Sequence, residues 1–222
     1  MSERRLEMTL TNQINEFREE FLPQLPEGVA GKLDEGVQKM LASHGETNGL
    51  KVGQKMPSFS LSSATERVVY SENLLKEGTV VISFYRGGWC PYCNLELRAL
   101  QDILPEIEKH GGSLLAISPE LPDNSLSTQE KNELEFPVLS DTDNLVARSF
   151  GLEIDVPDLI VKLSKDLWEL GLTKLNGTEK HILPVPATYV VGSDGLVKYA
   201  FVDADYTKRA EPAEILKALG NQ

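Results

Sequence analysis

The chain has only two cysteines, Cys90 and Cys93, and both lie in one Trp-Cys-Pro-Tyr-Cys segment. Disulfide scaffolds spread their cysteines along the chain, so this pair does not indicate one. The apolar, β-branched run Val80–Tyr85 precedes the pair, and such a run is typical of a strand buried on both faces of a sheet. A helical pattern of leucines follows, and then a second apolar run at residues 113–118. This order predicts a parallel, right-handed strand–helix–strand crossover that carries the cysteines at its first turn.

Two amphipathic stripes precede this unit, over residues 6–21 and 29–40. We predict an N-terminal helical arm of residues 1–50 and a main α/β domain of residues 51–222. The apolar face of the arm needs a partner, which is either the main domain or the second subunit of a homodimer. The pattern also predicts strands at residues 67–70, 136–139, 187–191 and 196–202, and helices at residues 124–134, 144–150, 158–170 and 211–219.

The charge of the chain excludes some classes of partner. Lys and Arg number 22 against 34 Asp and Glu, which gives a net charge of −12 and argues against binding to nucleic acid or to an anionic membrane. No apolar run approaches the length of a membrane span, and the segment Met1–Leu10 lacks the apolar core of a signal peptide. We expect a cytoplasmic protein that uses no cofactor.

The placement of the cysteines predicts their chemistry. Proline is favourable in the first turn of a helix, so Pro91 puts Cys90 near the N-cap and Cys93 one turn further on. The free N–H groups and the helix dipole favour a thiolate there, and the thiolate is the reactive form of cysteine. The pair therefore predicts a reversible dithiol–disulfide cycle.

Two other interpretations of the pair are weaker. The spacing could supply half of a tetrahedral zinc site, but only His44, His110 and His181 could complete it. None of the three stands at a metal-ligand spacing from the cysteines. Two buried cysteines without a function would not require the strand before them, the Gly-Gly turn and the helix after them.

Several segments resemble known redox families. The segment 89–93 after a buried strand resembles the thioredoxin superfamily, and its Cys-Pro-Tyr-Cys is similar to glutaredoxin. Phe-Pro-Val-Leu-Ser-Asp-Thr-Asp at 136–143 and Pro-Ala-Thr-Tyr-Val-Val at 186–191 are similar to peroxiredoxin segments. Over residues 52–220 the chain resembles the peroxiredoxin-like branch of the alkyl hydroperoxide reductase/thiol-specific antioxidant (AhpC/TSA) family, in which an N-terminal helical arm also occurs. The resemblance implies a thioredoxin-like fold, with a central mixed sheet flanked by helices.

The resemblance also aligns individual residues with the active-site motif of peroxiredoxins. Peroxiredoxins carry Pro-x-x-x-Thr-x-x-Cys; here Arg86 stands at the proline, Cys90 at the threonine and Cys93 at the peroxidatic cysteine. Glu96 matches a glutamate common in the family. Pro186 occupies the place of the family's late arginine, where thioredoxins have a cis-proline. Two supporting groups of the peroxiredoxin site are thus replaced.

The implied function is a thiol-dependent peroxidase that reduces hydrogen peroxide or organic hydroperoxides through a Cys90–Cys93 disulfide, which thioredoxin, glutathione or glutaredoxin then reduces. The peroxiredoxin comparison makes Cys93 the attacking thiol, whereas the thioredoxin comparison favours Cys90 as the more exposed one. Both orders stay open. The alternatives are a protein disulfide oxidoreductase and a non-catalytic, redox-dependent binding protein.

Further residues are candidates for the substrate site. Trp89 flanks the cysteine pair, or else fills the core. Arg86 or Arg148 could supply the positive charge that a peroxide site requires.

Val185 and Pro186 resemble the segment beside the cis-proline of thioredoxins, where a bound peptide pairs as an added strand; an ordinary turn proline is the alternative. The polar residues 203–209 are predicted to form a solvated surface loop.

Overall fold

The strand that leads to the cysteines is β3, Thr79–Phe84, all of whose residues are buried. The computed structural model describes residues 8–44 and 49–220. Leu6, the first residue of the predicted arm stripe, and residues 45–48 of the predicted arm lie outside the described residues. The buried strand that the sequence predicts at residues 80–85 is confirmed, and its bounds are shifted by one residue.

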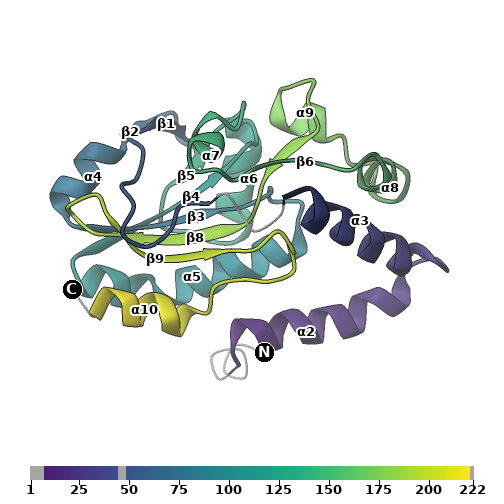
Figure 1. Cartoon of the computed structure of the whole chain (residues 1–222), viewed down its shortest axis with the longest axis horizontal. Coiled ribbons are helices and arrows are strands. Elements are labelled where there is room, and N and C mark those ends of the chain that lie inside the picture. The colour runs from purple at the N-terminus through teal and green to yellow at the C-terminus, as the bar shows by residue number, and fades with distance from the viewer. Residues whose placement is uncertain (1–7, 45–48, 221–222) are drawn as a thin grey trace.

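The main sheet has seven strands in the order β2-β1-β5-β4-β3-β8-β9 (Figure 1). Strand β3 pairs in parallel with β4 and antiparallel with β8, so the sheet is mixed, as predicted. The parallel crossover from β3 through the cysteine-bearing helix to β4 is also confirmed. The remaining strands are β1 (Ser60–Ser63), β2 (Val68–Tyr70), β4 (Gly112–Ser118), β5 (Val138–Ser140), β8 (Ala187–Val191) and β9 (Val197–Val202).

Helices cover both faces of the sheet. α5 (Pro91–Lys109) and α10 (Pro212–Gly220) lie together on one face, below the strands in Figure 1. α4 (Ser71–Glu77) and α7 (Leu145–Ser149) lie on the opposite face. α6 (Pro122–Lys131) packs against β5 and β1.

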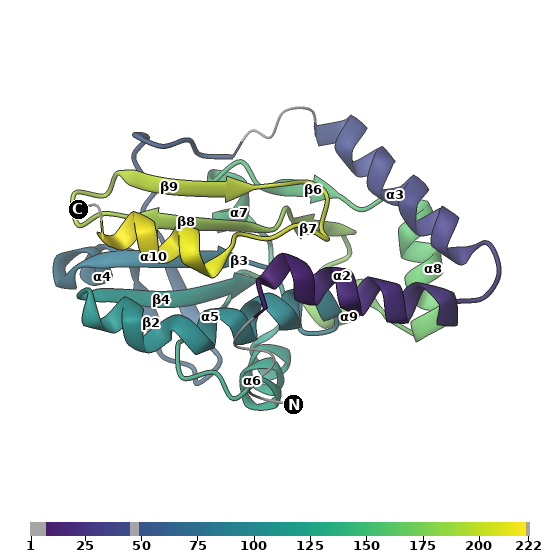
Figure 2. The same ribbon diagram turned by 90° about the horizontal axis from the view of Figure 1, so that it is seen from below.

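The two helices of the predicted arm both contact the rest of the same chain. α2 (Leu10–Phe21) lies beside α5, and α3 (Val29–His44) lies beside α8 (Asp158–Trp168), as Figures 1 and 2 show. A short 3-10 turn, Leu22–Gln24, follows α2 where the sequence places Pro23. The division of the chain into an arm and a main domain near residue 50 stays a prediction.

Several short elements were not predicted, among them β1, α4, α9 (Leu172–Asn176), and the strands β6 (Glu153–Asp155) and β7 (Ile182–Pro184). The two strands pair with each other in a separate sheet, which joins segments about thirty residues apart. α5 contains Pro105 and continues through it to Lys109. Within the described ranges, no helix is both long and apolar enough to cross a membrane.

Candidate active site

A tight loop carries the chain from β3 to the cysteines. Gly87 has φ +146°, and a Cβ on it would come within 2.3 Å of the Trp89 Nε1. A Cβ on Gly88 would come within 1.9 Å of the Thr128 Oγ1, so the pair of glycines is required by the close packing of this loop. The loop delivers Cys90 to the N-cap of α5 with Pro91 as its first residue, as predicted.

Both cysteines are free thiols and both are buried: Cys90 is 1% exposed and Cys93 is 0% exposed. They differ in what surrounds them. Cys90 lines a cavity, whereas Cys93 lies in the core beneath it. The structure thus gives Cys90 the more accessible position, although neither thiol is on the surface.

The group closest to the Cys93 sulfur comes from far along the chain. The Nη2 of Arg209 lies 3.2 Å from the Cys93 Sγ, and its Nε lies 2.6 Å from the Glu96 Oε2. The same guanidinium donates to the carbonyls of Tyr206 and Lys208, which fix its orientation. The prediction of a solvated loop over residues 203–209 is wrong at Tyr206 and at Arg209, which are 7% and 5% exposed.

Sequence reasoning missed Arg209 because nothing local marks it. It follows β9 in a segment of charged and polar residues, which is the usual composition of a surface loop. Glu96 was singled out by resemblance, and the structure gives it a second contact, from the Thr188 hydroxyl at 3.0 Å. A buried glutamate requires a cationic partner, and this is the signal that could have prompted a search for one.

A second cation lies against the other cysteine. The Nη1 of Arg86 is 3.9 Å from the Cys90 Sγ. Its guanidinium carbon lies over the ring of Tyr206, 4.0 Å from the centroid, and 4.9 Å from that of Trp89. Of the two arginines proposed from the sequence, Arg86 is the one placed at the thiols.

The other candidate residues bond to other partners. Arg148 pairs with Glu153 at 2.7 Å and is exposed. The Val185 amide donates to the Leu152 carbonyl at 2.7 Å, so pairing with a bound peptide there would require this bond to break. The peptide bond before Pro186 is trans, which corrects the likeness to the thioredoxin cis-proline.

The electrostatics of the pair favour one thiolate. Burial opposes ionisation of Cys90, but the hydrogen bond from the Cys93 thiol and the charges of Arg86 and Arg209 outweigh burial and lower its pKa to about 5. Burial raises the pKa of Cys93, and the neighbouring Cys90 sulfur raises it further. The negative charge therefore resides on Cys90, which has the N-cap position.

Two buried carboxyl groups lie close to the thiols. Burial raises the pKa of Glu96 to about 7 despite the charge of Arg209, and it raises the pKa of Glu120 to about 7 despite a hydrogen bond from the Gly88 amide at 2.8 Å. Both groups can therefore hold or release a proton near neutral pH.

Above Cys90 lies a cavity of about 350 Å³ with mainly apolar walls, which we call the aromatic chamber. The arm helices α2 and α3, the active-site loop and α8 all contribute to it. Its lining residues are Phe17, Phe21, Leu33, Arg86, Trp89, Cys90, Pro91, Tyr92, Ile160, Ser164, Trp168, Leu170 and Tyr206.

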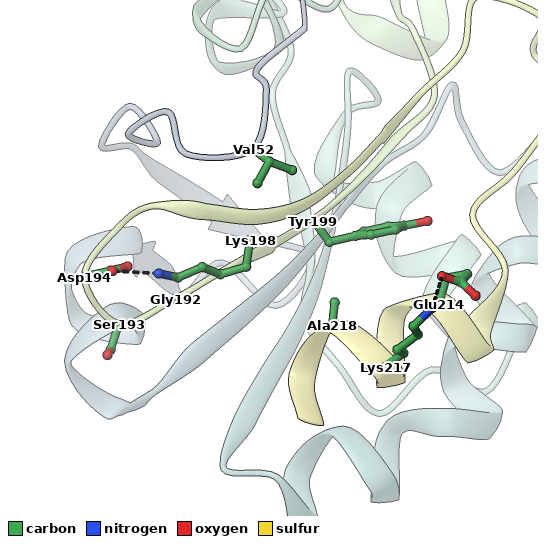
Figure 3. Close-up of a pocket in the computed structure, with 9 residues that line it drawn as sticks. All are labelled: Val52, Gly192, Ser193, Asp194, Lys198, Tyr199, Glu214, Lys217 and Ala218. Atoms are coloured by element: carbon green, nitrogen blue, oxygen red, sulfur yellow. Dashed lines mark hydrogen bonds and ion pairs between the residues drawn. The ribbon is translucent and has the colours of Figure 1, made fainter. Parts of the chain in front are cut away.

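A second hollow, of about 570 Å³, lies between the β8–β9 turn and α10 (Figure 3). Its two lysines are both paired: Lys198 lies 2.7 Å from Asp194, and Lys217 lies 3.6 Å from Glu214. Neither cysteine lines it, so the chemistry belongs to the aromatic chamber.

The chain is similar to known peroxiredoxins in sequence and in fold. The chain is 32% identical to the peroxiredoxin Bcp of Escherichia coli (strain K12) over 105 residues, which cover 47% of this chain and 67% of that protein. Its fold is similar to the crystal structure of the peroxidoxin BcpB from Mycobacterium tuberculosis, with a TM-score of 0.60 and 22% identity over 78% of this chain and 97% of that one. A peroxiredoxin-like protein from Aquifex aeolicus gives a TM-score of 0.61 at 19% identity, over 78% and 88% of the two chains.

The structural matches confirm the predicted thioredoxin-like α/β fold. Residues 52–200 match the family described as AhpC/TSA, which is the family that the motifs indicated. Because this match takes in more than half of the sequence, the chain belongs to the AhpC/TSA family.

Proposed function

We propose that the chain reduces hydroperoxides with Cys90 as the attacking thiolate and Cys93 as the resolving thiol. Family membership and the similarity to peroxiredoxins make the chain an oxidoreductase, a thiol-dependent peroxidase. The roles of individual residues are our proposal. The observation that carries it is the contrast between the cysteines: Cys90 lines the chamber and has a pKa of about 5, whereas Cys93 lies below it with a raised pKa.

The cycle has three balanced steps. The Cys90 thiolate attacks the distal oxygen of ROOH and breaks the O–O bond, which gives a sulfenic acid on Cys90 and an alkoxide that takes up a proton and leaves as ROH. The Cys93 sulfur then attacks the Cys90 sulfur, which forms the disulfide and releases water. Two electrons and two protons from an external dithiol, or from two thiols, restore the reduced pair.

The two arginines serve different steps in this proposal. Arg86, at 3.9 Å from the Cys90 sulfur, stabilises the thiolate and the charge that develops on the departing oxygen. Arg209, at 3.2 Å from the Cys93 sulfur, favours the thiolate that Cys93 needs for the resolving step. Glu96 positions Arg209 through their ion pair.

The third step of the proposed cycle needs an external reductant. Thioredoxin, glutathione or glutaredoxin would each supply the thiol chemistry that the cycle requires. Since Cys90 is 1% exposed, a small thiol reaches it through the chamber, whereas a protein thiol needs the chamber to open. The same burial disfavours a general protein disulfide oxidoreductase, because every folded protein substrate would likewise need the chamber to open.

The order of attack is tested by trapping the sulfenic acid. Reduced wild-type, Cys90→Ser and Cys93→Ser proteins are mixed with one equivalent of hydroperoxide in the presence of dimedone and analysed by mass spectrometry. We expect a disulfide in the wild type, a dimedone adduct on Cys90 in Cys93→Ser, and oxidation of Cys90→Ser no faster than that of a free thiol. Rapid formation of an adduct on Cys93 in Cys90→Ser would reverse the two roles.

A further inference from the structure

Much of the wall of the aromatic chamber comes from parts of the chain that lie outside the strand–helix–strand unit of the cysteines, namely α2, α3 and α8. We propose that this chamber selects hydroperoxides with a bulky apolar body, and that Phe21 and Trp168 are specificity-determining residues. The inference rests on the proposed function, since it names the substrate class of the same thiol.

The chamber is chemically divided. Its reactive end holds Cys90 and Arg86, and the buried Nε of Arg86 has no hydrogen-bond partner in the described part of the chain. The walls are mostly aromatic or aliphatic. Beside Trp89, Tyr92 and Tyr206, they are formed by residues of α2, α3, α8 and the segment after α8. A ligand that matches this division has one polar, reactive group and an apolar remainder.

The size of the chamber points to the same class. About 350 Å³ is within the range of small-molecule sites, which spans roughly 300–1,000 Å³. Hydrogen peroxide has no apolar surface, so the walls contribute nothing to its binding. A branched or ring-bearing hydroperoxide gains free energy in proportion to the apolar area that it buries against them.

The walls are held in place before any ligand binds. The ring of Phe21 stacks with that of Trp168 at 6.5 Å between centroids, and Phe17 meets Tyr92 edge to face at 5.4 Å. α3 approaches α8 so closely that a Cβ on Gly36 would lie 2.1 Å from the Ile160 side chain. Because these side chains are already ordered, binding of a ligand costs little of their conformational entropy.

Trp168 marks the rim of the chamber. It is 43% exposed, which is high for so large an apolar side chain, while it also lines the cavity. Phe21, on α2, stacks with Trp168 and so also lies at this rim. The two residues therefore contact the part of a ligand that is farthest from the O–O bond, where the body of the substrate varies.

The test compares two peroxides. Stopped-flow tryptophan fluorescence, from Trp89 and Trp168 together or from Trp89 alone in Trp168→Ala, gives the rate constants for oxidation of reduced protein by cumene hydroperoxide and by hydrogen peroxide. The ratio of the two rate constants is compared among variants. We expect Phe21→Ala and Trp168→Ala to lower this ratio roughly tenfold, the effect of removing a well-matched apolar contact. Ser164→Phe, which fills the chamber, should lower it too by excluding the ring.

Tyr70→Ala is the matched control, because Tyr70 is an aromatic residue on β2 that is 53% exposed and lies outside the chamber. Its ratio should equal that of the wild type. An unchanged ratio in both Phe21→Ala and Trp168→Ala, in proteins that both peroxides oxidise, overturns the inference.

A binding measurement keeps the inference separate from the proposed function. The non-reactive analogue 2-phenyl-2-propanol is titrated into the Cys90→Ser protein, with Trp fluorescence as the readout. We expect saturable binding that weakens roughly tenfold in the Phe21→Ala background. If neither peroxide oxidises the wild type faster than a free thiol, the proposed function fails; absence of saturable binding overturns the chamber as a ligand site.

Discussion

The guanidinium of Arg209 lies 3.2 Å from the sulfur of Cys93, although 116 residues separate them in the chain. The same group forms the buried ion pair with Glu96, in which both side chains are almost completely inaccessible to water. Cys93 and Glu96 thus share one distant cation. Loss of that cation leaves the Glu96 carboxylate buried without a cationic partner, which is costly.

Arg209→Met should therefore destabilise the fold by about 3 kcal/mol, measured by urea denaturation at neutral pH. The double variant Glu96→Gln with Arg209→Met should recover part of this loss, because no lone charge is left in the core. Arg148→Met removes an exposed ion pair and should change stability by no more than about 0.5 kcal/mol. Equal losses for the two single variants would show that Arg209 has no special electrostatic role.

The thiolate should reside on Cys90. The ultraviolet absorbance of the thiolate, followed against pH, should show a step near the pKa of about 5 in the wild type and lose it in Cys90→Ser. In Cys93→Ser the step should remain at low pH, because the serine hydroxyl can still donate a hydrogen bond to the Cys90 sulfur and Arg86 is still present. An unchanged step in Cys90→Ser would assign the charge to Cys93.

Glu120 should make stability depend on pH. Its pKa is raised from 4.5 to about 7 in the folded protein, so the folded state binds the proton more tightly than the unfolded state does. The stability of the wild type relative to Glu120→Gln should be highest below about pH 4.5, fall as the pH rises to about 7, and then level off. The measurement is urea denaturation at a series of pH values.

Glu108→Gln, at an exposed position on α5, is the control for that series. A difference between wild type and Glu120→Gln that stays constant from pH 4.5 to 7 would contradict the burial of an ionisable Glu120 carboxyl.

Glu211 should anchor the first arm helix. Its carboxylate accepts hydrogen bonds from the backbone amides of Leu10 and Thr11, at 3.1 and 2.8 Å, and so caps α2 from the segment before α10. Glu211→Ala should weaken this attachment by about 1 kcal/mol, the usual value of a lost N-cap. Faster hydrogen exchange of the α2 amides would report it.

Glu214→Ala gives the comparison for Glu211→Ala, because Glu214 pairs with the exposed Lys217. Exchange in α2 that rises equally in both variants would show that general loosening of α10, rather than the cap, is responsible.

The sequence by itself determined the unit that carries the chemistry. Val80–Tyr85 had to be a buried strand because of its apolar, β-branched run, and Pro91 had to begin a helix because it lacks an amide proton. Those local constraints place Cys90 at the helix N-terminus in the structure. The same locality explains why Ala187–Val191 was predicted with its observed bounds.

Only the tertiary structure decided what surrounds the thiols. Arg209 reaches Cys93 because the segment between β9 and α10 returns across α5, and Glu120 reaches Gly88 because β4 ends beside the active-site loop. The chamber forms where residues of α2 and α8 come together with Cys90. Each of these contacts joins residues far apart in sequence, and their choice depends on how the helices pack onto the sheet, which local periodicity does not encode.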